Sequence, residues 1–224
     1  MTSISLPDRD YAAFLFDMDG TILTSIKAAE RVWGEWAKGH GLDVEAFLPT
    51  IHGKRTEDTI RALALTGVDP AAEARRITLA EIEDVAGIEA IAGAADFLAS
   101  LPAGRWAIVT SAPRALAEAR IRAAGMPLPA VLVAAEDVQR GKPAPDPFLL
   151  GASRLGVVPE QCLAFEDTLA GLTAADSAGM DTVLITATHT HVLDTNGVSV
   201  FDYGDLRAAV TPDGMLRLAL GQQG

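Results

Sequence analysis

Short apolar runs that recur along the chain limit its possible folds more than any other feature of the sequence. Uninterrupted runs of this length are typical of strands buried on both faces of a sheet. Helix-like stretches separate the later runs, which favours a parallel α/β sheet with its site at the carboxyl ends of the strands. The runs are YAAFLF at 11–16, WAIV at 106–109, AVLVAA at 130–135, CLAF at 162–165 and TVLI at 182–185.

The segment from about 26 to 92 contains no convincing strand. Its first part, IKAAERVWGEWAKGHG, places apolar residues at helical spacing and ends in glycines that stop a helix. RTEDTIRALALTG and PAAEARRITLAEIEDVAG predict two more helices. We therefore expect a helical insert between the first and second core strands. The sequence after about residue 186 is weakly patterned and predicts only a late strand near 198–201.

The charge balance excludes some partners. The 224 residues carry a formal net charge of −12 at pH 7, which opposes binding to nucleic acid and to anionic membranes. The first residues, MTSISLPDRD, lack the pattern of a signal peptide, and every apolar run is far shorter than the ~20 residues that span a bilayer. We expect a cytoplasmic protein, and nothing in the sequence implies an obligate protein partner.

Two aspartates follow the first apolar run. In FLFDMDGT, Asp17 and Asp19 are separated by one residue, so both carboxylates could face the same side of the chain. Like charges this close raise a pKa or recruit a cation. An ordinary turn is an equally open interpretation. An EF-hand loop fails, because Gly20 comes too early and Ala28 stands where that loop needs a glutamate.

Three more polar clusters follow later runs. Thr110 and Ser111 could hold an anion at a helix start, although capping of that helix is the more ordinary interpretation. Lys142 lies in the proline-rich loop GKPAPDP, where a fixed cation could meet a phosphate, or it is simply solvated. Glu166 and Asp167 could ligate a metal with their hard oxygens, or merely favour the start of the next helix.

Taken in this order, the four clusters resemble the motifs of the haloacid dehalogenase (HAD) superfamily of aspartate-nucleophile phosphatases. The matching pieces are DMDGT at 17–21, TS at 110–111, GKPAPDPF at 141–148 and FEDTLAG at 165–171. The resemblance covers nearly the whole chain. It implies a Rossmann-like parallel sheet core at 1–25 and 93–224, with an inserted α-helical cap domain at 26–92 that sets substrate specificity.

The cap stretches ERVWGEWAKGHGL (30–42) and IHGKRTEDTI (51–60) look most similar to bacterial sugar phosphatases and to the glycerol- and deoxyglucose-phosphate phosphatases. This narrower resemblance implies an enzyme that hydrolyses a small-molecule phosphate ester, a sugar or polyol phosphate. His52, Lys54 and Arg55 are the candidates for contacting the sugar, and a solvated polar helix start is the equal alternative.

The resemblance also implies a mechanism. Asp17 would be the nucleophile that forms an aspartyl-phosphate, and Asp19 would act as general acid and then general base. Mg²⁺ would be held by Asp17, the main-chain carbonyl of Asp19 and Asp167, with Glu166 as a further or outer ligand. Lys142 would be a second cation at the phosphoryl group. Thr110 and the Ser111 amide would hold phosphate oxygens.

Three other classes of protein share part of this pattern. A dehalogenase would need neither Asp19 nor a metal. A sugar phosphomutase of the β-phosphoglucomutase type shares all four clusters, but it carries a histidine near the position of Ala29. The receiver modules of two-component signalling gather similar residues around an aspartyl-phosphate but do not turn over. They are usually about half as long as this chain, and their acceptor aspartate lies on a later strand than their acidic pair. Hydrolysis therefore fits the sequence best.

Overall fold

The computed structural model describes residues 6–51, 53–193, 195 and 197–221 of the chain. Its centre is a six-stranded sheet in which every neighbouring pair of strands is parallel, in the order β6-β5-β2-β7-β8-β9. The strands are β2 (Ala13–Phe16), β5 (Trp106–Val109), β6 (Val131–Val133), β7 (Cys162–Glu166), β8 (Asp181–Ile185) and β9 (Val198–Val200).

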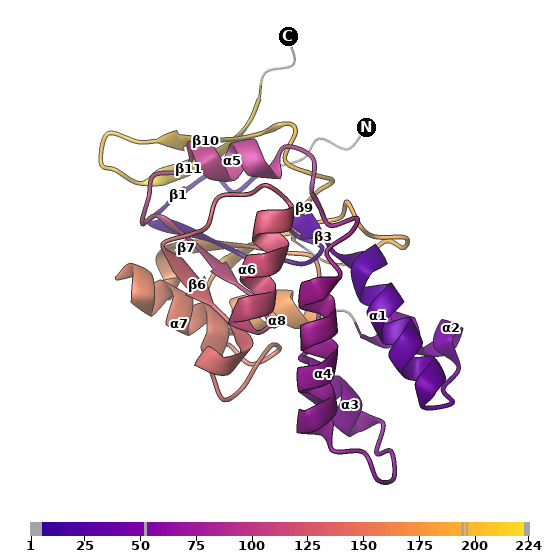
Figure 1. The fold of residues 1–224 in the computed structure, drawn as a ribbon. Helices are drawn as coiled ribbons and strands as arrows, with labels where there is room; N and C mark the ends of the chain where they lie inside the picture. Colours follow the sequence, from indigo (N-terminus) through magenta and orange to yellow (C-terminus); the bar gives the residue numbers. More distant parts are fainter. Residues whose placement is uncertain (1–5, 52, 194, 196, 222–224) are drawn as a thin grey trace.

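Helices cover both faces of this sheet (Figure 1). In β2, Phe14 and Phe16 belong to one apolar cluster with α5 and α6, while Leu15 belongs to the opposite cluster with α7 and α8. This alternation follows from the two-residue period of a strand, and it explains why β2 is apolar throughout. The helices are α5 (Ala94–Ser100), α6 (Arg114–Ala123), α7 (Asp146–Leu155) and α8 (Leu169–Ser177), with short 3₁₀ turns η2 (Ala135–Asp137) and η3 (Pro159–Gln161).

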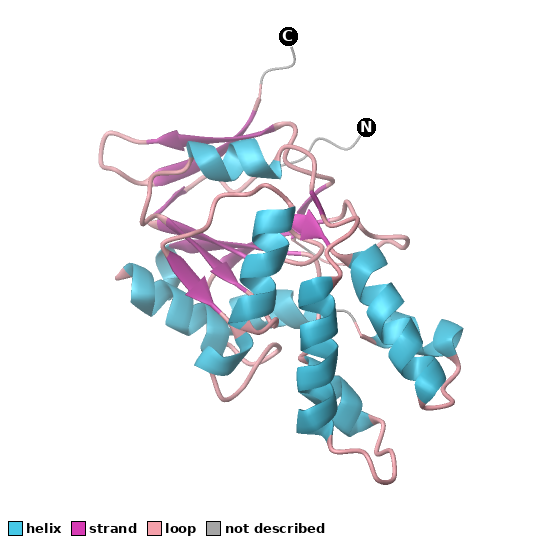
Figure 2. Cartoon of the chain, in the orientation of Figure 1, coloured by secondary structure: helices cyan, strands magenta, loops and turns pink. Residues whose placement is uncertain are grey.

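A second group of helices lies beside the sheet and packs around its own apolar cluster, which includes Trp33, Trp36 and Phe47 (Figures 1 and 2). We call this group the cap. It consists of α1 (Ile26–Gly39), α2 (Val44–Phe47), η1 (Leu48–Thr50), α3 (Thr56–Ala62) and α4 (Pro70–Glu83).

The chain enters and leaves the cap through a small antiparallel pair, β3 (Leu23–Thr24) with β4 (Glu89–Ala90). The expectation that 26–92 holds no strand is therefore wrong for β4. Two residues are too short for a sequence pattern, and only their pairing with β3 defines them. We propose that this pair marks the boundary between the core and the cap.

Segments near both ends of the described chain form a further sheet that the sequence did not predict. It has the order β1-β11-β10 and contains β1 (Asp10–Tyr11), β10 (Leu206–Val210) and β11 (Leu216–Leu220). The first apolar run is accordingly divided between β1 and β2. The late strand expected near 198–201 is present as β9. Within the described residues, no helix is both long and apolar enough to cross a membrane.

Candidate active site

Asp17 and Lys142 meet at the carboxyl edge of the sheet. Asp17 directly follows β2, and Lys142 lies in the loop between β6 and α7. The Lys142 Nζ donates to Asp17 Oδ1 at 2.5 Å, to Glu166 Oε1 at 2.5 Å and to the Val109 carbonyl at 2.9 Å. Its side chain is 3% exposed, so this lysine is not solvated. Burial alone would lower the pKa of Lys142, but Asp17 and Glu166 outweigh that effect and raise it.

Glu166 uses both of its carboxylate oxygens to hold neighbouring groups. While Oε1 accepts from Lys142, Oε2 accepts from the Asp167 and Thr168 amides at 3.0 and 3.2 Å and from the Thr168 hydroxyl at 3.1 Å. Gly171 leaves room for this carboxylate, because a Cβ there would lie 1.8 Å from Glu166 Oε1. Glu166 thus fixes both Lys142 and the loop that carries Asp167.

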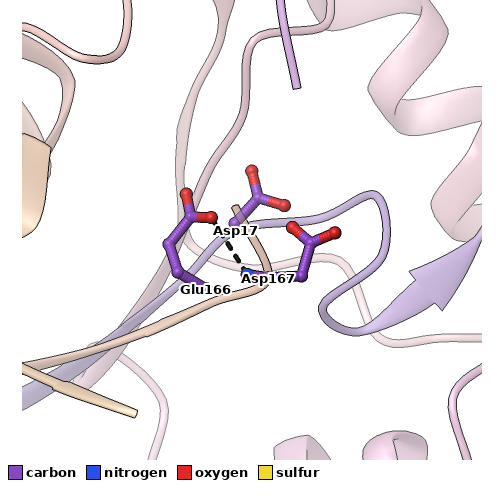
Figure 3. A group of neighbouring side chains, drawn as sticks. All are labelled: Asp17, Glu166 and Asp167. Atoms are coloured by element: carbon purple, nitrogen blue, oxygen red, sulfur yellow. Dashed lines mark hydrogen bonds between the residues drawn. The ribbon is translucent and has the colours of Figure 1, made fainter. Parts of the chain in front are cut away.

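Three carboxylates gather where β2 and β7 end. Among the described residues, Asp17, Glu166 and Asp167 form a group whose oxygens lie within 4.8 Å of one another (Figure 3). Burial, together with the other carboxylates, raises the pKa of Asp17 to about 7 and raises that of Asp167 as well, although Lys142 opposes both shifts. One lysine does not balance this negative charge, so the site favours another cation.

The group fits Mg²⁺ in its donors, and the backbone leaves room for the Asp167 carboxylate. Mg²⁺ binds carboxylate oxygens in preference to nitrogen or sulfur. Gly20 has a φ of +90°, and a Cβ there would lie 1.9 Å from Asp167 Oδ2, so glycine is needed for that carboxylate to reach the site. Because Glu166 already uses both oxygens, we expect it to support the ion rather than to bind it directly.

The Asp19 carboxylate belongs to a different network. Its Oδ1 accepts from the Ser25 hydroxyl at 2.6 Å, and its Oδ2 accepts from Arg120 Nη1 at 2.9 Å. Arg120 Nη2 donates in turn to Glu81 Oε1 at 2.8 Å. Burial raises the pKa of Glu81 to about 7, and Arg120 opposes that shift. Asp17 and Asp19 are therefore two residues apart in sequence but are paired to different buried cations.

Thr110 and Ser111 follow β5. Helix α6 begins only at Arg114, after Pro113, so neither hydroxyl caps it as the ordinary interpretation expected. Instead, Thr110 Oγ1 accepts from the Ala112 amide at 3.1 Å, which closes a turn before the helix. Ser111 Oγ donates to the Gly53 carbonyl of the cap at 3.4 Å.

A pocket between the cap and the core opens onto these residues. The core contributes Asp17, Asp19, Thr110, Ser111, Arg120 and Lys142, and the cap contributes Ala29, Trp33, Lys54 and Glu81. Lys54 is exposed and reaches the pocket. Arg55 instead donates to the core carbonyls of Val138 and Gln139 at 2.8 and 3.0 Å, so it joins the cap to the core rather than lining this pocket. His52 lies outside the described residues.

Comparison with known proteins identifies the family. The haloacid dehalogenase-like hydrolase family matches residues 11–179. The chain belongs to the haloacid dehalogenase-like hydrolases. This confirms the predicted family and the predicted parallel α/β core. Residues 11–179 include all four sequence clusters and the cap, so the match covers the site and the pocket above it.

Several proteins of named activity or known structure are similar to this hydrolase. It is 44% identical to hexitol phosphatase A of Escherichia coli (strain K12) over 178 residues, which cover 78% of this chain and 82% of that protein. It is 38% identical to the fructose-1-phosphate phosphatase YqaB of the same strain over 185 residues, 77% and 95% of the two chains. The fold is similar to the crystal structure of CbbY from Rhodobacter sphaeroides in complex with phosphate, with a TM-score of 0.75. The two sequences are 26% identical, and the match covers 87% of this chain and 96% of CbbY.

Sequence analysis missed Arg120 and Glu81, although both leave a signal. The residues of α6 that are buried are Leu116, Ala117, Arg120 and Ile121, so the arginine lies on the apolar face of its helix. Glu81 lies four residues after the buried Ile77 in α4, also on the buried face. A charged residue on an apolar helix face is rarely buried without a partner, and here each is the partner of the other.

Proposed function

We propose that this hydrolase is a Mg²⁺-dependent phosphatase that hydrolyses small sugar or polyol phosphates through an aspartyl-phosphate on Asp17. The observation that carries the proposal is the position of Asp17. Asp17 directly follows a core strand, and its carboxylate pairs with Lys142, adjoins the Asp167 carboxylate and lines the pocket beneath the cap. A phosphate ester in that pocket would find a nucleophile and a buried cation side by side.

In the first half of the reaction, an Asp17 oxygen forms a bond to phosphorus, and the bond from phosphorus to the ester oxygen breaks. Asp19 gives its proton to the departing alkoxide, which leaves as the alcohol. In the second half, Asp19 takes a proton from water as that water bonds to phosphorus. The bond from phosphorus to Asp17 then breaks, and inorganic phosphate leaves.

Other residues of the chain would support both halves. Lys142 holds the Asp17 carboxylate in place and balances charge on the phosphoryl oxygens, while Thr110 and the Ser111 amide would orient those oxygens. Mg²⁺, held by Asp17, Asp167 and the Asp19 carbonyl, would supply charge neutralisation between the attacking carboxylate and the phosphoryl group.

The substrate class rests on the relatives and on the pocket. Hexitol phosphatase A and the fructose-1-phosphate phosphatase are named for phosphate esters of small polyhydroxy compounds. The pocket of this chain adds Lys54 and Thr56 as polar groups and Trp33 as an apolar surface. Such a mixture suits a small polyol chain, whose hydroxyls need donors and acceptors and whose carbons need an apolar surface.

A phosphomutase is the second candidate, and Ala29 argues against it. Ala29 lies in α1, lines the pocket and stands near the position where the mutases carry histidine. A methyl group can neither give nor take a proton. A sugar held after the first half would therefore leave as an alcohol instead of attacking the phosphoenzyme again.

The test is a phosphate-release screen with hexose, pentose, hexitol, glycerol and nucleotide monophosphates, in Mg²⁺ and after removal of metal by a chelator. We expect many turnovers with a sugar or polyol phosphate in Mg²⁺, little release without metal, and none from Asp17→Asn. Full activity after chelation contradicts the metal role. Conversion of a sugar 1-phosphate to its 6-phosphate faster than hydrolysis assigns the protein to the mutases, and a single turnover assigns it to the receivers.

A further inference from the structure

Arg120 is a buried cation that the proposed reaction does not use. Its side chain is only 7% exposed, and it lies between two carboxylates, Asp19 of the core and Glu81 of the cap. Glu81 is equally enclosed, with a side chain 4% exposed. Taking an arginine and a glutamate out of water costs free energy that surface pairs do not incur, so a buried pair beside a reactive group needs an explanation.

The two buried cations of the site divide the carboxylates between them. Lys142 holds Asp17 and Glu166, and Arg120 holds Asp19 and Glu81. Arg120 and Ser25 each bind one oxygen of Asp19, which fixes the orientation of that carboxylate.

The geometry depends on arginine and on the cap. The two terminal nitrogens of one guanidinium reach two different carboxylates, at 2.9 and 2.8 Å, so the rigid planar fork of arginine sets the spacing of the two acceptors. Arg120 comes from α6 of the core and Glu81 from α4 of the cap. The arginine is therefore fully held only while the cap lies against the core.

We propose that Arg120 is a positioning residue for the acid–base carboxylate Asp19, and that Glu81 acts through Arg120. The pair determines the position of the Asp19 carboxylate relative to the ester oxygen and the attacking water, and it does not affect the position of Asp17. This inference rests on the proposed phosphatase function. It predicts that loss of the pair impairs proton transfer and spares the attack of Asp17.

The test compares a substrate that needs a proton on its leaving group with one that does not. Arg120→Met, Glu81→Gln and the double variant are assayed with sorbitol 6-phosphate, an alkyl ester, and in rapid mixing with 4-nitrophenyl phosphate. Matched controls are Arg122→Met, an exposed arginine of the same helix paired with Glu118, and Glu83→Gln, an exposed glutamate of α4. Melting temperatures and circular dichroism confirm that each variant is folded.

We expect Arg120→Met to lower kcat for sorbitol 6-phosphate about 10²-fold, the lower end of what acid–base groups contribute. The first release of nitrophenol should keep its rate within about threefold and be followed by a slow steady phase, because only dephosphorylation then needs Asp19. Glu81→Gln should lower kcat for sorbitol 6-phosphate about 10-fold in the same pattern, and the double variant should match Arg120→Met, because Glu81 acts only through the arginine. Both controls should behave as the wild type.

Equal losses in the nitrophenol burst and in sorbitol 6-phosphate hydrolysis would overturn the inference, and so would single losses that multiply in the double variant. If Arg120→Met does not fold with two carboxylates left unpaired, Glu81→Gln still decides the matter. That variant keeps the arginine, so a normal rate with sorbitol 6-phosphate refutes the proposed positioning. A wild type that releases phosphate from no ester refutes the proposed function itself, a result separate from these.

Discussion

Replacing Lys142 with methionine should strongly destabilise the metal-free protein. The Nζ atom makes three contacts of 2.5–2.9 Å, and the side chain is 3% exposed, so the substitution removes buried interactions rather than exposed ones. Asp17 and Glu166 would be left as buried neighbours without their shared cation. Breaking a buried ion pair in this way typically costs about 3–5 kcal/mol. For a protein of this size that corresponds to a fall in Tm of roughly 6–20 °C.

The assay is urea unfolding at pH 8 in the presence of a chelator, with thermal melting as a second measurement. Adding Glu166→Gln to Lys142→Met should restore part of the lost stability, because one of the two stranded charges is removed. Lys38→Met is the matched control. Lys38 also pairs with a glutamate, Glu35 at 2.7 Å, but its side chain is 63% exposed, so its loss should not change stability measurably.

The loss should be smaller at pH 5.5 than at pH 8. Burial already raises the pKa of Asp17 to about 7, and removing Lys142 takes away the main opposing charge, so Asp17 can neutralise itself by binding a proton. A change below about 1 kcal/mol at pH 8, the range of an exposed pair, would refute the claim that Lys142 is the shared cation of two buried carboxylates.

Three further predictions concern residues around the pocket. Asp19→Asn should lower kcat for alkyl phosphates about 10²–10⁴-fold and less for 4-nitrophenyl phosphate, with a burst of nitrophenol; equal losses without a burst would make Asp19 a structural or metal residue only. Lys54→Ala should change the ranking of sugar phosphates in the screen more than it slows small generic esters, whereas a uniform small loss would mean a solvated lysine. Burial raises the pKa of Glu81 from 4.5 to about 7, so between these pH values the folded protein binds a proton that the unfolded chain has released. This contribution to the free energy of unfolding is complete below pH 4.5 and is lost as pH rises through 7. Wild type should therefore lose stability relative to Glu81→Gln between pH 5 and 8, by at most about 3 kcal/mol in urea unfolding, and a constant difference would contradict the shift.

The central sheet was predictable mainly because its inner strands β2, β5 and β7 are buried on both faces. A run such as CLAF needs no knowledge of its neighbours to be recognised as a strand. The hairpin of β10 and β11 was missed because LRAAV and LRLAL carry exposed residues, and their pairing is what makes them strands. The turn Thr211–Pro212–Asp213–Gly214 between them was the available signal, since proline and glycine at these places favour a turn.

The candidate site, too, was only partly predictable from the sequence. The contact of Lys142 with Asp17 and the grouping of Asp17, Glu166 and Asp167 follow from motifs at the ends of neighbouring strands, which the sheet order brings together. The Arg120–Glu81 pair joins a core helix to a cap helix across 39 residues of sequence, so it depends on how the two units pack. The contact of Arg55 with the core depends on that packing too, because its hydrogen-bond acceptors are backbone carbonyls, which no residue pattern reveals.

The most direct test of the account is to trap the phosphoenzyme. The wild-type protein is mixed with Mg²⁺ and a sugar phosphate that it hydrolyses, quenched in acid within the first turnovers and digested for mass spectrometry, with borohydride reduction to mark an acyl phosphate. We predict a single phosphorylated site at Asp17, absent from Asp17→Asn and longer-lived in Asp19→Asn. A label on any other residue, or rapid turnover in Asp17→Asn, would contradict the assignment of Asp17 as the nucleophile.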